Sequence, residues 1–180
     1  DKTDLLHYLD IGLEVEEDDF DEAEELKKVS EPKTKLGDII QLGNHRLICG
    51  DSTDPTVVKK LFGDDKASMI YSDPIYNIKI DYNKGIGGKA SYGGNVTDNR
   101  TDEEYHNLIE KSITNALSVA GKDLHVFYWC DESYIWLIQT AYRKLGIDNR
   151  RVCLWIKNSQ NPTPQVAFNR SYEPCVYATR

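Results

Sequence analysis

The stretch that decides the fold runs from residue 67 to residue 76 and reads Ala-Ser-Met-Ile-Tyr-Ser-Asp-Pro-Ile-Tyr. Its first half, residues 67–71, is a short and mainly apolar run of the kind that forms a strand in a sheet. The Ser72-Asp73-Pro74 break ends this run, because proline lacks the amide hydrogen that a central strand needs. In open α/β sheets, ligands bind beyond the carboxyl ends of the strands. The stretch therefore predicts a strand that presents Asp73 at a functional edge.

Signals for further strands and helices lie on both sides of this stretch. Helix starts are indicated by Asp54-Pro55 and by the spacing from Thr101 to Glu104, and a helix end by Gly146. Strands that alternate with helices predict an α/β fold, with a Rossmann-like, mostly parallel sheet and helices on both faces. The expected strands are 39–42, 45–49, 67–71, 124–130 and 151–157, and the expected helices are 54–62, 101–121 and 134–145.

Charge divides the chain into two parts. The 180 residues carry a net charge of −8. Residues 1–35 hold 13 acidic residues and five Lys, a balance of 5 − 13 = −8, so residues 36–180 are neutral with 17 charges of each sign. We interpret 1–35 as an acidic linker or the end of an upstream domain, and 36–180 as the folded domain. Residues 141–180 hold seven basic and two acidic residues, which could face phosphate or be solvated helix ends and strand edges.

Several classes of protein are disfavoured by composition. No run approaches the roughly 18–20 apolar residues that span a membrane, and the first residues lack the order of a signal peptide, so a cytoplasmic protein is expected. The four cysteines form no C-x-x-C pair and the histidines lack ligand spacing, so no metal site is expected. No convincing Cys/His or Ser/His/Asp arrangement is present, which disfavours a covalent enzyme intermediate.

The turn after residue 72 suits one particular chemistry. Exocyclic amines of nucleobases are poor nucleophiles, because the nitrogen lone pair is delocalised into the ring. An enzyme that alkylates one needs hydrogen-bond acceptors for the amine and a surface on which a flipped base can stack. Asp73, the carbonyl of Pro74 and the ring of Tyr76 offer that set. Alone, Asp-Pro-x-Tyr is also common in ordinary turns, so the context of the motif matters.

The context resembles a known family. Asp73-Pro74-Ile75-Tyr76 resembles motif IV, Asp-Pro-Pro-Tyr, of the DNA amino-methyltransferases that modify adenine N6 or cytosine N4. Residues 36–53, Leu-Gly-Asp-Ile-Ile-Gln-Leu-Gly-Asn-His-Arg-Leu-Ile-Cys-Gly-Asp-Ser-Thr, resemble the lead-in of the permuted beta class, which often follows a ParB-like nuclease domain. Residues 155–157, Trp-Ile-Lys, and 170–174, Arg-Ser-Tyr-Glu-Pro, resemble later landmarks of that class. The resemblance covers residues 36–180 and implies part of a class I S-adenosylmethionine-dependent methyltransferase fold.

The resemblance also implies roles for individual residues. Asp73 and the Pro74 carbonyl would accept hydrogen bonds from the target amine, and Tyr76 would stack on a base flipped out of double-stranded DNA. Asp51 and Ser52, together with Asp73, would lie at the S-adenosylmethionine. Asn77 is also expected to contact the substrate. Apart from the resemblance, Lys79 and Lys84 lie in a glycine-rich loop that mixes cations and aromatics as a DNA-clamping loop would, and simple solubility accounts for these lysines about as well. A homodimer is left open.

The predicted function is methyl transfer to adenine N6, with two alternatives. Ile75 replaces the second proline of the motif, which removes one conformational lock and predicts a weakened or conditional activity. The alternatives are therefore a decayed DNA-binding or regulatory module of the same fold, or a cytosine-N4 methyltransferase. Tyr172 stands where related sequences carry His. In the permuted class the Phe-x-Gly-x-Gly cofactor loop and the target-recognition region come later than this segment, so residues 1–180 alone are expected to be inactive. The setting, restriction-modification, phage or mobile element, stays open.

Overall fold

The computed structural model describes residues 21–28, 31, 33–79, 97–161 and 170–180. The chain forms two compact units, Asp1–Lys35 and Leu36–Arg180. In the first unit, helix α2 (Glu22–Lys28) is described, and the Lys28 ammonium lies 2.7 Å from a carboxylate oxygen of Glu25 one turn earlier. The second unit contains two sheets and the remaining helices. No helix among the described residues is long and apolar enough to cross a membrane.

The second unit begins with a small hairpin and a helix. Strands β1 (Ile39–Leu42) and β2 (His45–Ile48) pair antiparallel in a sheet of their own, with Gly43 at φ +57° in the tight turn between them. Helix α3 (Pro55–Phe62) follows. Its N-cap is Asp54, whose carboxylate accepts a hydrogen bond of 2.8 Å from the amide of Thr56. The predicted strands and helix start in this region are confirmed, but the two strands stand apart from the main sheet.

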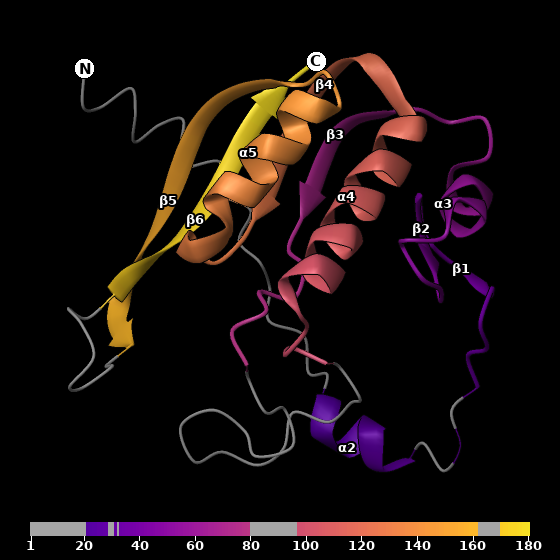
Figure 1. Cartoon of the computed structure of the whole chain (residues 1–180). Coiled ribbons are helices and arrows are strands. Elements are labelled where there is room, and N and C mark those ends of the chain that lie inside the picture. The colour runs from indigo at the N-terminus through magenta and orange to yellow at the C-terminus, as the bar shows by residue number, and fades with distance from the viewer. Residues whose placement is uncertain (1–20, 29–30, 32, 80–96, 162–169) are drawn as a thin grey trace, which may run out of the picture. The chain divides into compact units, whose positions relative to one another are not determined.

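The main sheet is mixed, so the prediction of a mostly parallel sheet is wrong. Its strand order is β3-β4-β6-β5 (Figure 1). Strands β3 (Ala67–Ser72) and β4 (Ala120–Trp129) are parallel, whereas β6 (Arg170–Thr179) is antiparallel to both β4 and β5 (Asp148–Asn161). A parallel pair needs a crossover connection such as a helix, and helix α4 (Asp102–Ser118) supplies one between β3 and β4. Only eight residues separate β5 from β6, so the chain reverses and the pair is antiparallel.

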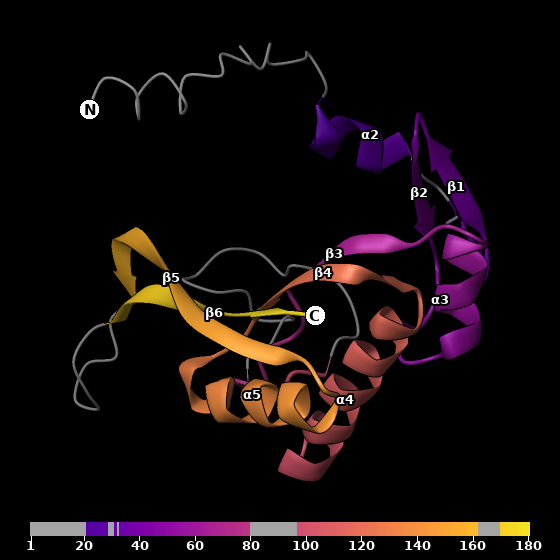
Figure 2. The ribbon, with the colours of Figure 1, turned by 90° about the horizontal axis from the view of Figure 1, so that it is seen from above.

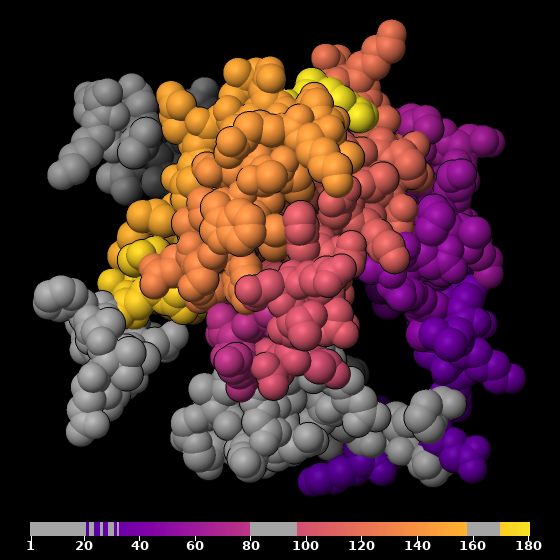
Figure 3. All heavy atoms as spheres, viewed as in Figure 1, coloured from indigo at the N-terminus to yellow at the C-terminus, as the bar shows by residue number. Residues whose placement is uncertain are grey.

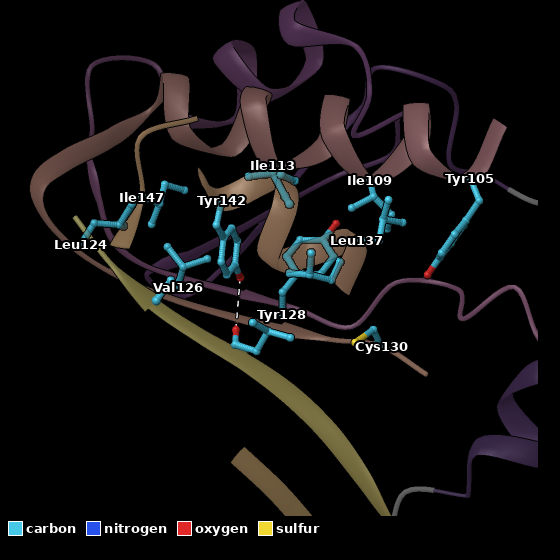
Figure 4. Packing of buried hydrophobic residues seen from close by; sticks show 14 residues of the cluster. Tyr105, Ile109, Ile113, Leu124, Val126, Tyr128, Cys130, Leu137, Tyr142 and Ile147 are labelled. Atoms are coloured by element: carbon cyan, nitrogen blue, oxygen red, sulfur yellow. Dashed lines mark hydrogen bonds between the residues drawn. The ribbon is translucent and has the colours of Figure 1, made fainter. Parts of the chain in front are cut away.

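Two helices cover one face of this sheet. Helices α4 (Asp102–Ser118) and α5 (Ile135–Lys144), the latter preceded by the short helix η1 (Glu132–Tyr134), lie on the same side (Figure 2), and their atoms form a continuous surface over it (Figure 3). Alternate residues of β4 point into the layer beneath them, where Leu124, Val126 and Tyr128 are buried (Figure 4). In the same core, the hydroxyl of Tyr142 donates a 3.2 Å hydrogen bond to the carbonyl of Val176.

The other face of the sheet carries aromatic side chains. Phe127 of β4 stacks on Tyr177 of β6 with ring centroids 4.8 Å apart, and Trp129 meets Trp155 edge to face at 6.4 Å. Tyr71, beside Phe127 in the parallel register, is 62% exposed, and Trp155 is 55% exposed. The expected helices on both faces are thus found on one face among the residues that the structure describes.

Candidate active site at the end of strand β3

The carboxyl end of β3 presents a carboxylate with one oxygen engaged. Asp73 follows the last residue of β3 and is exposed. The hydroxyl of Tyr76 donates a hydrogen bond of 2.8 Å to Asp73 Oδ1. Burial raises the pKa of Tyr76, and the Asp73 carboxylate raises it further, so the phenol stays protonated and remains a donor. Within the described ranges, the one hydrogen bond to the Asp73 side chain is that from Tyr76 to Oδ1, and none reaches Oδ2.

Helix α4 restrains the turn that holds Asp73. The carbonyl of Ile75 accepts a hydrogen bond of 2.9 Å from the hydroxyl of Tyr105, a fully buried residue of α4. The side chain of Ile75 packs against the core cluster. A proline at this position would restrict φ of its own residue, whereas here a tertiary hydrogen bond and apolar packing restrain the turn.

Asn77 ties the turn to the segment before α4. Asn77 is 7% exposed, and its amide hydrogen donates to Asp98 Oδ1 at 2.7 Å. Its side-chain oxygen accepts from the amide of Arg100 at 2.7 Å, and its side-chain nitrogen donates to the Tyr134 hydroxyl at 3.0 Å. Asn77 and Lys79 have φ of +56° and +64°, a region that costs free energy for residues with a side chain. The hydrogen bonds of Asn77 offset this cost, so it shapes the turn from inside.

An ion pair from the far strands reaches the same tyrosine. Glu173 Oε2 of β6 lies 3.5 Å from the Tyr76 hydroxyl, and Glu173 Oε1 pairs with the ammonium of Lys157 of β5. The side chains of Lys157 and Glu173 are only 22% and 23% exposed. The Lys157 ammonium also lies 4.9 Å from the ring centroid of Trp155. Tyr76 therefore has a carboxylate on each side of its hydroxyl.

A second ion pair anchors the beginning of β6. Arg170 Nη1 lies 2.6 Å from Asp131 Oδ2, and the amide of Ser133 donates to Asp131 Oδ1 at 3.0 Å. Burial pushes the pKa of Asp131 upwards, but the hydrogen bonds from Arg170 and Ser133 outweigh it and hold the pKa below its ordinary value. Nearby, the hydroxyl of Tyr172 donates to a carboxylate oxygen of Glu132. These contacts join the start of β6 to the turn that follows β4.

Two of the three predicted cofactor residues, Asp51 and Ser52, lie in the turn after β2. The carboxylate of Asp51 accepts hydrogen bonds of 2.8 Å from the amide and the hydroxyl of Thr53, which lower its pKa. The carbonyl of Ser52 accepts from the side chain of Asn115 in α4 at 3.0 Å. Ser52 and Ser72, the neighbour of Asp73, line one apolar pocket of about 290 Å³. Asp51 lines a different, polar pocket of about 500 Å³.

The predicted site residues are thus partly brought together. Ser52 borders the same pocket as the end of β3, but among the described residues no hydrogen bond or ion pair joins Asp51 to Asp73. Lys79 is exposed. Lys84 lies outside the described residues. No group of three or more His, Cys, Asp or Glu side chains in the described ranges could hold a metal ion.

The comparison with protein families covers the strand, the turn and the ion pair just described. The profile of the N6/N4 DNA methylases, a family described as DNA methylase, matches residues 67–180, which is more than half of the chain. The chain belongs to the N6/N4 DNA methylase family. The match starts at the first residue of β3 and includes Asp73, Tyr76 and Glu173.

Solved structures similar to this DNA methylase chain include two of M1.HpyAVI. The crystal structure of M1.HpyAVI is 13% identical with a TM-score of 0.46, and the match covers 71% of this chain and 54% of that one. For the crystal structure of the M1.HpyAVI-SAM complex, the identity is 14%, the TM-score 0.46, and the match covers 72% of this chain and 52% of that one. The chain therefore spans about half the length of these proteins. No curated protein matches it.

Reasoning from the sequence missed several residues of this DNA methylase chain that hold the site together. Tyr105, Asp98 and Arg100 gave no signal, because a tyrosine on the inner face of a helix and a polar loop suggest only packing and solvation. Lys157 and Glu173, by contrast, do have a signal in the sequence. Trp155 and Lys157 are two residues apart and so lie on one face of β5, and Glu173 is the only acidic residue of β6, where a charge within a sheet requires a partner.

The basic residues near the C-terminus of the DNA methylase chain are mostly engaged with acids. Lys144 lies 2.5 Å from Glu110, and Arg150 lies 3.1 Å from Asp148. Lys157 and Arg170 pair with Glu173 and Asp131, as described above. These pairings favour the interpretation of solvated, ion-paired edges over a phosphate-binding surface for this part of the chain.

Proposed function

We propose that this chain carries the target-base site of a S-adenosylmethionine-dependent DNA methyltransferase that acts on adenine N6. The observation that supports this is the state of Asp73, with Oδ1 held by Tyr76 and Oδ2 without a hydrogen bond among the described residues. Asp73 Oδ2 and the Pro74 carbonyl would accept the two amine hydrogens. Both bonds would draw the nitrogen towards tetrahedral geometry, so that its lone pair would bond to the methyl carbon as the bond from that carbon to the sulfonium sulfur breaks, and the nitrogen would then lose one proton to water.

The other residues of the turn would bind the base and the DNA. The ring of Tyr76, whose hydroxyl is fixed, would serve as the stacking surface for a base flipped out of the duplex. Asn77 would act from inside by shaping the turn, because its side-chain amide is already engaged. Lys79 and Lys84 would approach the DNA backbone, where a positive charge is favourable. Double-stranded DNA is thus the proposed partner, and a homodimer stays a prediction.

S-adenosylmethionine would be held at Ser52, Asp51 and Asp73. The pocket shared by Ser52 and Ser72 has apolar walls and hydroxyl groups at its edge, and such surroundings fit the adenosyl group. The Asp73 carboxylate next to this pocket fits a positively charged sulfonium. When bound, the cofactor supplies an electrophilic methyl group, and the residues of the chain bind and orient the amine that receives it.

We also propose the finer assignments of class and location. The resemblance of residues 36–53 to the lead-in of the permuted beta class, which often follows a ParB-like nuclease domain, is what supports these assignments. A cytoplasmic location in a bacterium, with the protein encoded by the bacterium or a phage, suits an enzyme that acts on DNA.

The decisive experiment is methylation of DNA by the full-length protein with labelled cofactor, followed by digestion to nucleosides. We expect label in N6-methyladenosine, and label in N4-methylcytosine would assign the cytosine alternative instead. Asp73→Ala and Asp73→Asn should each abolish the label while the far-UV circular dichroism stays unchanged. Asp123→Asn, at an exposed carboxylate of β4, is the matched control and should retain full activity. Activity that survives Asp73→Ala would exclude the proposed role of Asp73.

A decayed DNA-binding or regulatory module is the second candidate, and Ile75 is the observation that favours it. In that case the folded protein would bind DNA but transfer no label. The hydrogen bond from Tyr105 to the Ile75 carbonyl supports the catalytic alternative, since the turn is restrained without the second proline.

A further inference from the structure

We propose that Lys157 and Glu173 are positioning residues for Tyr76, and that this ion pair directs the Tyr76 hydroxyl proton towards Asp73. The inference rests on the proposed function, because it assigns the pair a role in preparing Asp73 for the target amine. Neither residue would touch the base or the cofactor.

The sheet brings the pair to Tyr76. Trp155 and Glu173 are directly opposite each other in the antiparallel register of β5 and β6, and Lys157 follows Trp155 by two residues on the same face. Tyr76 comes from the turn after β3, at the other side of the sheet order β3-β4-β6-β5. Its hydroxyl oxygen lies 2.8 Å from Asp73 Oδ1 and 3.5 Å from Glu173 Oε2. Strands β5 and β6, which are distant from Tyr76 in the sequence, thus place the Lys157–Glu173 ion pair next to the Tyr76 hydroxyl.

The phenol has one proton and two carboxylates that could accept it. The distances make Asp73, at 2.8 Å, the stronger acceptor of this proton and Glu173, at 3.5 Å, the weaker one. Glu173 is instead neutralised by the Lys157 ammonium at its other oxygen. Without Lys157, the charge of Glu173 would compete for the same proton. If Glu173 won, Asp73 Oδ1 would lose its donor, and the ring that the base stacks on would tilt.

The Lys157–Glu173 pair is suited to fix the orientation of the Tyr76 hydroxyl, because little water reaches the two side chains. Both side chains are more than three-quarters buried, so the removal of one partner leaves a charge that water solvates poorly. The Lys157 ammonium also rests over the ring of Trp155, which restricts its position further. Such a pair contributes to orientation more than to stability, because its desolvation cost offsets much of its attraction.

The first test needs no activity. A fluorinated tyrosine whose phenol titrates near neutral pH is placed at position 76 of the 180-residue chain, and its absorbance is followed against pH. The charged groups around it are Asp73, Glu173 and Lys157, and the thiol of Cys130, whose pKa is raised by burial, is a further titratable neighbour that stays neutral. Glu173→Gln removes a negative charge and should lower the phenol pKa by about 1, and Lys157→Met should raise it by a similar amount. Lys157→Arg keeps the charge and should leave the pKa within about 0.3.

The matched control is the Lys144–Glu110 ion pair, which lies on the helical side. Glu110→Gln removes a carboxylate from an ion pair of the same type and should leave the pKa at position 76 unchanged. If Glu173→Gln and Lys157→Met have no more effect than Glu110→Gln, the pair does not act on Tyr76 and the inference is overturned.

The second test measures catalysis by the full-length protein. Lys157→Met leaves the charge of Glu173 free to compete for the Tyr76 proton and should lower kcat about 10- to 100-fold, with the KM for DNA within about twofold, because misplacement of a reacting group affects the chemical step. Lys157→Arg should restore most of the rate. If Lys157→Met leaves kcat unchanged while Asp73→Ala abolishes activity, the positioning role is overturned and the proposed function stands. Activity retained by Asp73→Ala would overturn the proposed function itself, whatever the titration shows.

Discussion

At position 75 the turn carries isoleucine where the family motif has proline, and a tyrosine from α4 holds the carbonyl of that residue. Proline restrains a turn through its own ring, at no cost to the rest of the fold. Tyr105 restrains the same turn through a hydrogen bond that exists only when α4 is packed in place. The restraint at Ile75 therefore depends on tertiary structure, and the turn should be sensitive to changes in α4.

Tyr105→Phe removes one hydroxyl and leaves the Ile75 carbonyl without its donor. We expect the free energy of unfolding to fall by about 1–3 kcal/mol, the usual cost of an unsatisfied buried group, and methyl transfer by the full-length protein to fall about tenfold. Tyr142→Phe is the matched control, because Tyr142 is equally buried and donates to the carbonyl of Val176. It should lose similar stability and keep its activity. Equal activity losses in the two variants would contradict a specific role for Tyr105.

Among the elements, β6 is the one on which the site depends most. It lies between β4 and β5, carries Glu173, and is anchored at its first residue by the Arg170–Asp131 pair. Because Arg170 precedes Glu173 by only three residues, a loss of this anchor would release the end of the strand that is nearest to Glu173. The anchor therefore supports the site as well as the fold.

Asp131→Asn tests the anchor through its pH dependence. The pKa of Asp131 is below its ordinary value of 3.8, so the charged form is favoured in the folded state. The stabilisation is therefore complete above about pH 4 and is lost as the pH falls through the lowered pKa. Urea unfolding should show a stability difference between wild type and Asp131→Asn that is largest near pH 6 and shrinks below pH 4. Asp148→Asn, in an exposed pair with Arg150, should show little difference at either pH.

For the whole molecule, charge and fold are separated along the chain. Residues 36–180 form one of the two compact units and are neutral, whereas residues 1–35 carry all of the net charge of −8. An acidic segment repels DNA phosphates over about a Debye length. The acidic segment should therefore weaken DNA association by the neutral unit without stabilising it.

A chain of residues 36–180 tests this separation. We expect its free energy of unfolding to lie within about 0.5 kcal/mol of that of residues 1–180, the usual range for changes away from a core. Its affinity for duplex DNA should be higher at low salt, and the difference should vanish near 1 M salt, where charges are screened within about 3 Å. A large loss of stability, or a DNA affinity difference that persists at high salt, would show that residues 1–35 act by contact.

Local signals in the sequence predicted most of the elements and the principal turn. The N-cap at Asp54, the capping box from Thr101 to Glu104 and the glycine at 146 lie next to the helix ends they specify, and each was confirmed. The strand that leads to Asp73 was confirmed as well. Such signals act within three or four residues, so they can be read without knowledge of the fold.

The sequence by itself determined the turn that follows the strand ending at Ser72, the alternation of strands and helices, and the acidity of residues 1–35. Only the tertiary structure decided that the sheet is mixed, that β6 lies between β4 and β5, and that Tyr105, Lys157 and Glu173 converge on the turn. The physical reason is range. A cap or a turn depends on its immediate neighbours, whereas strand order and the partners of a buried charge depend on residues 30 to 97 positions away, which meet only when the chain has folded.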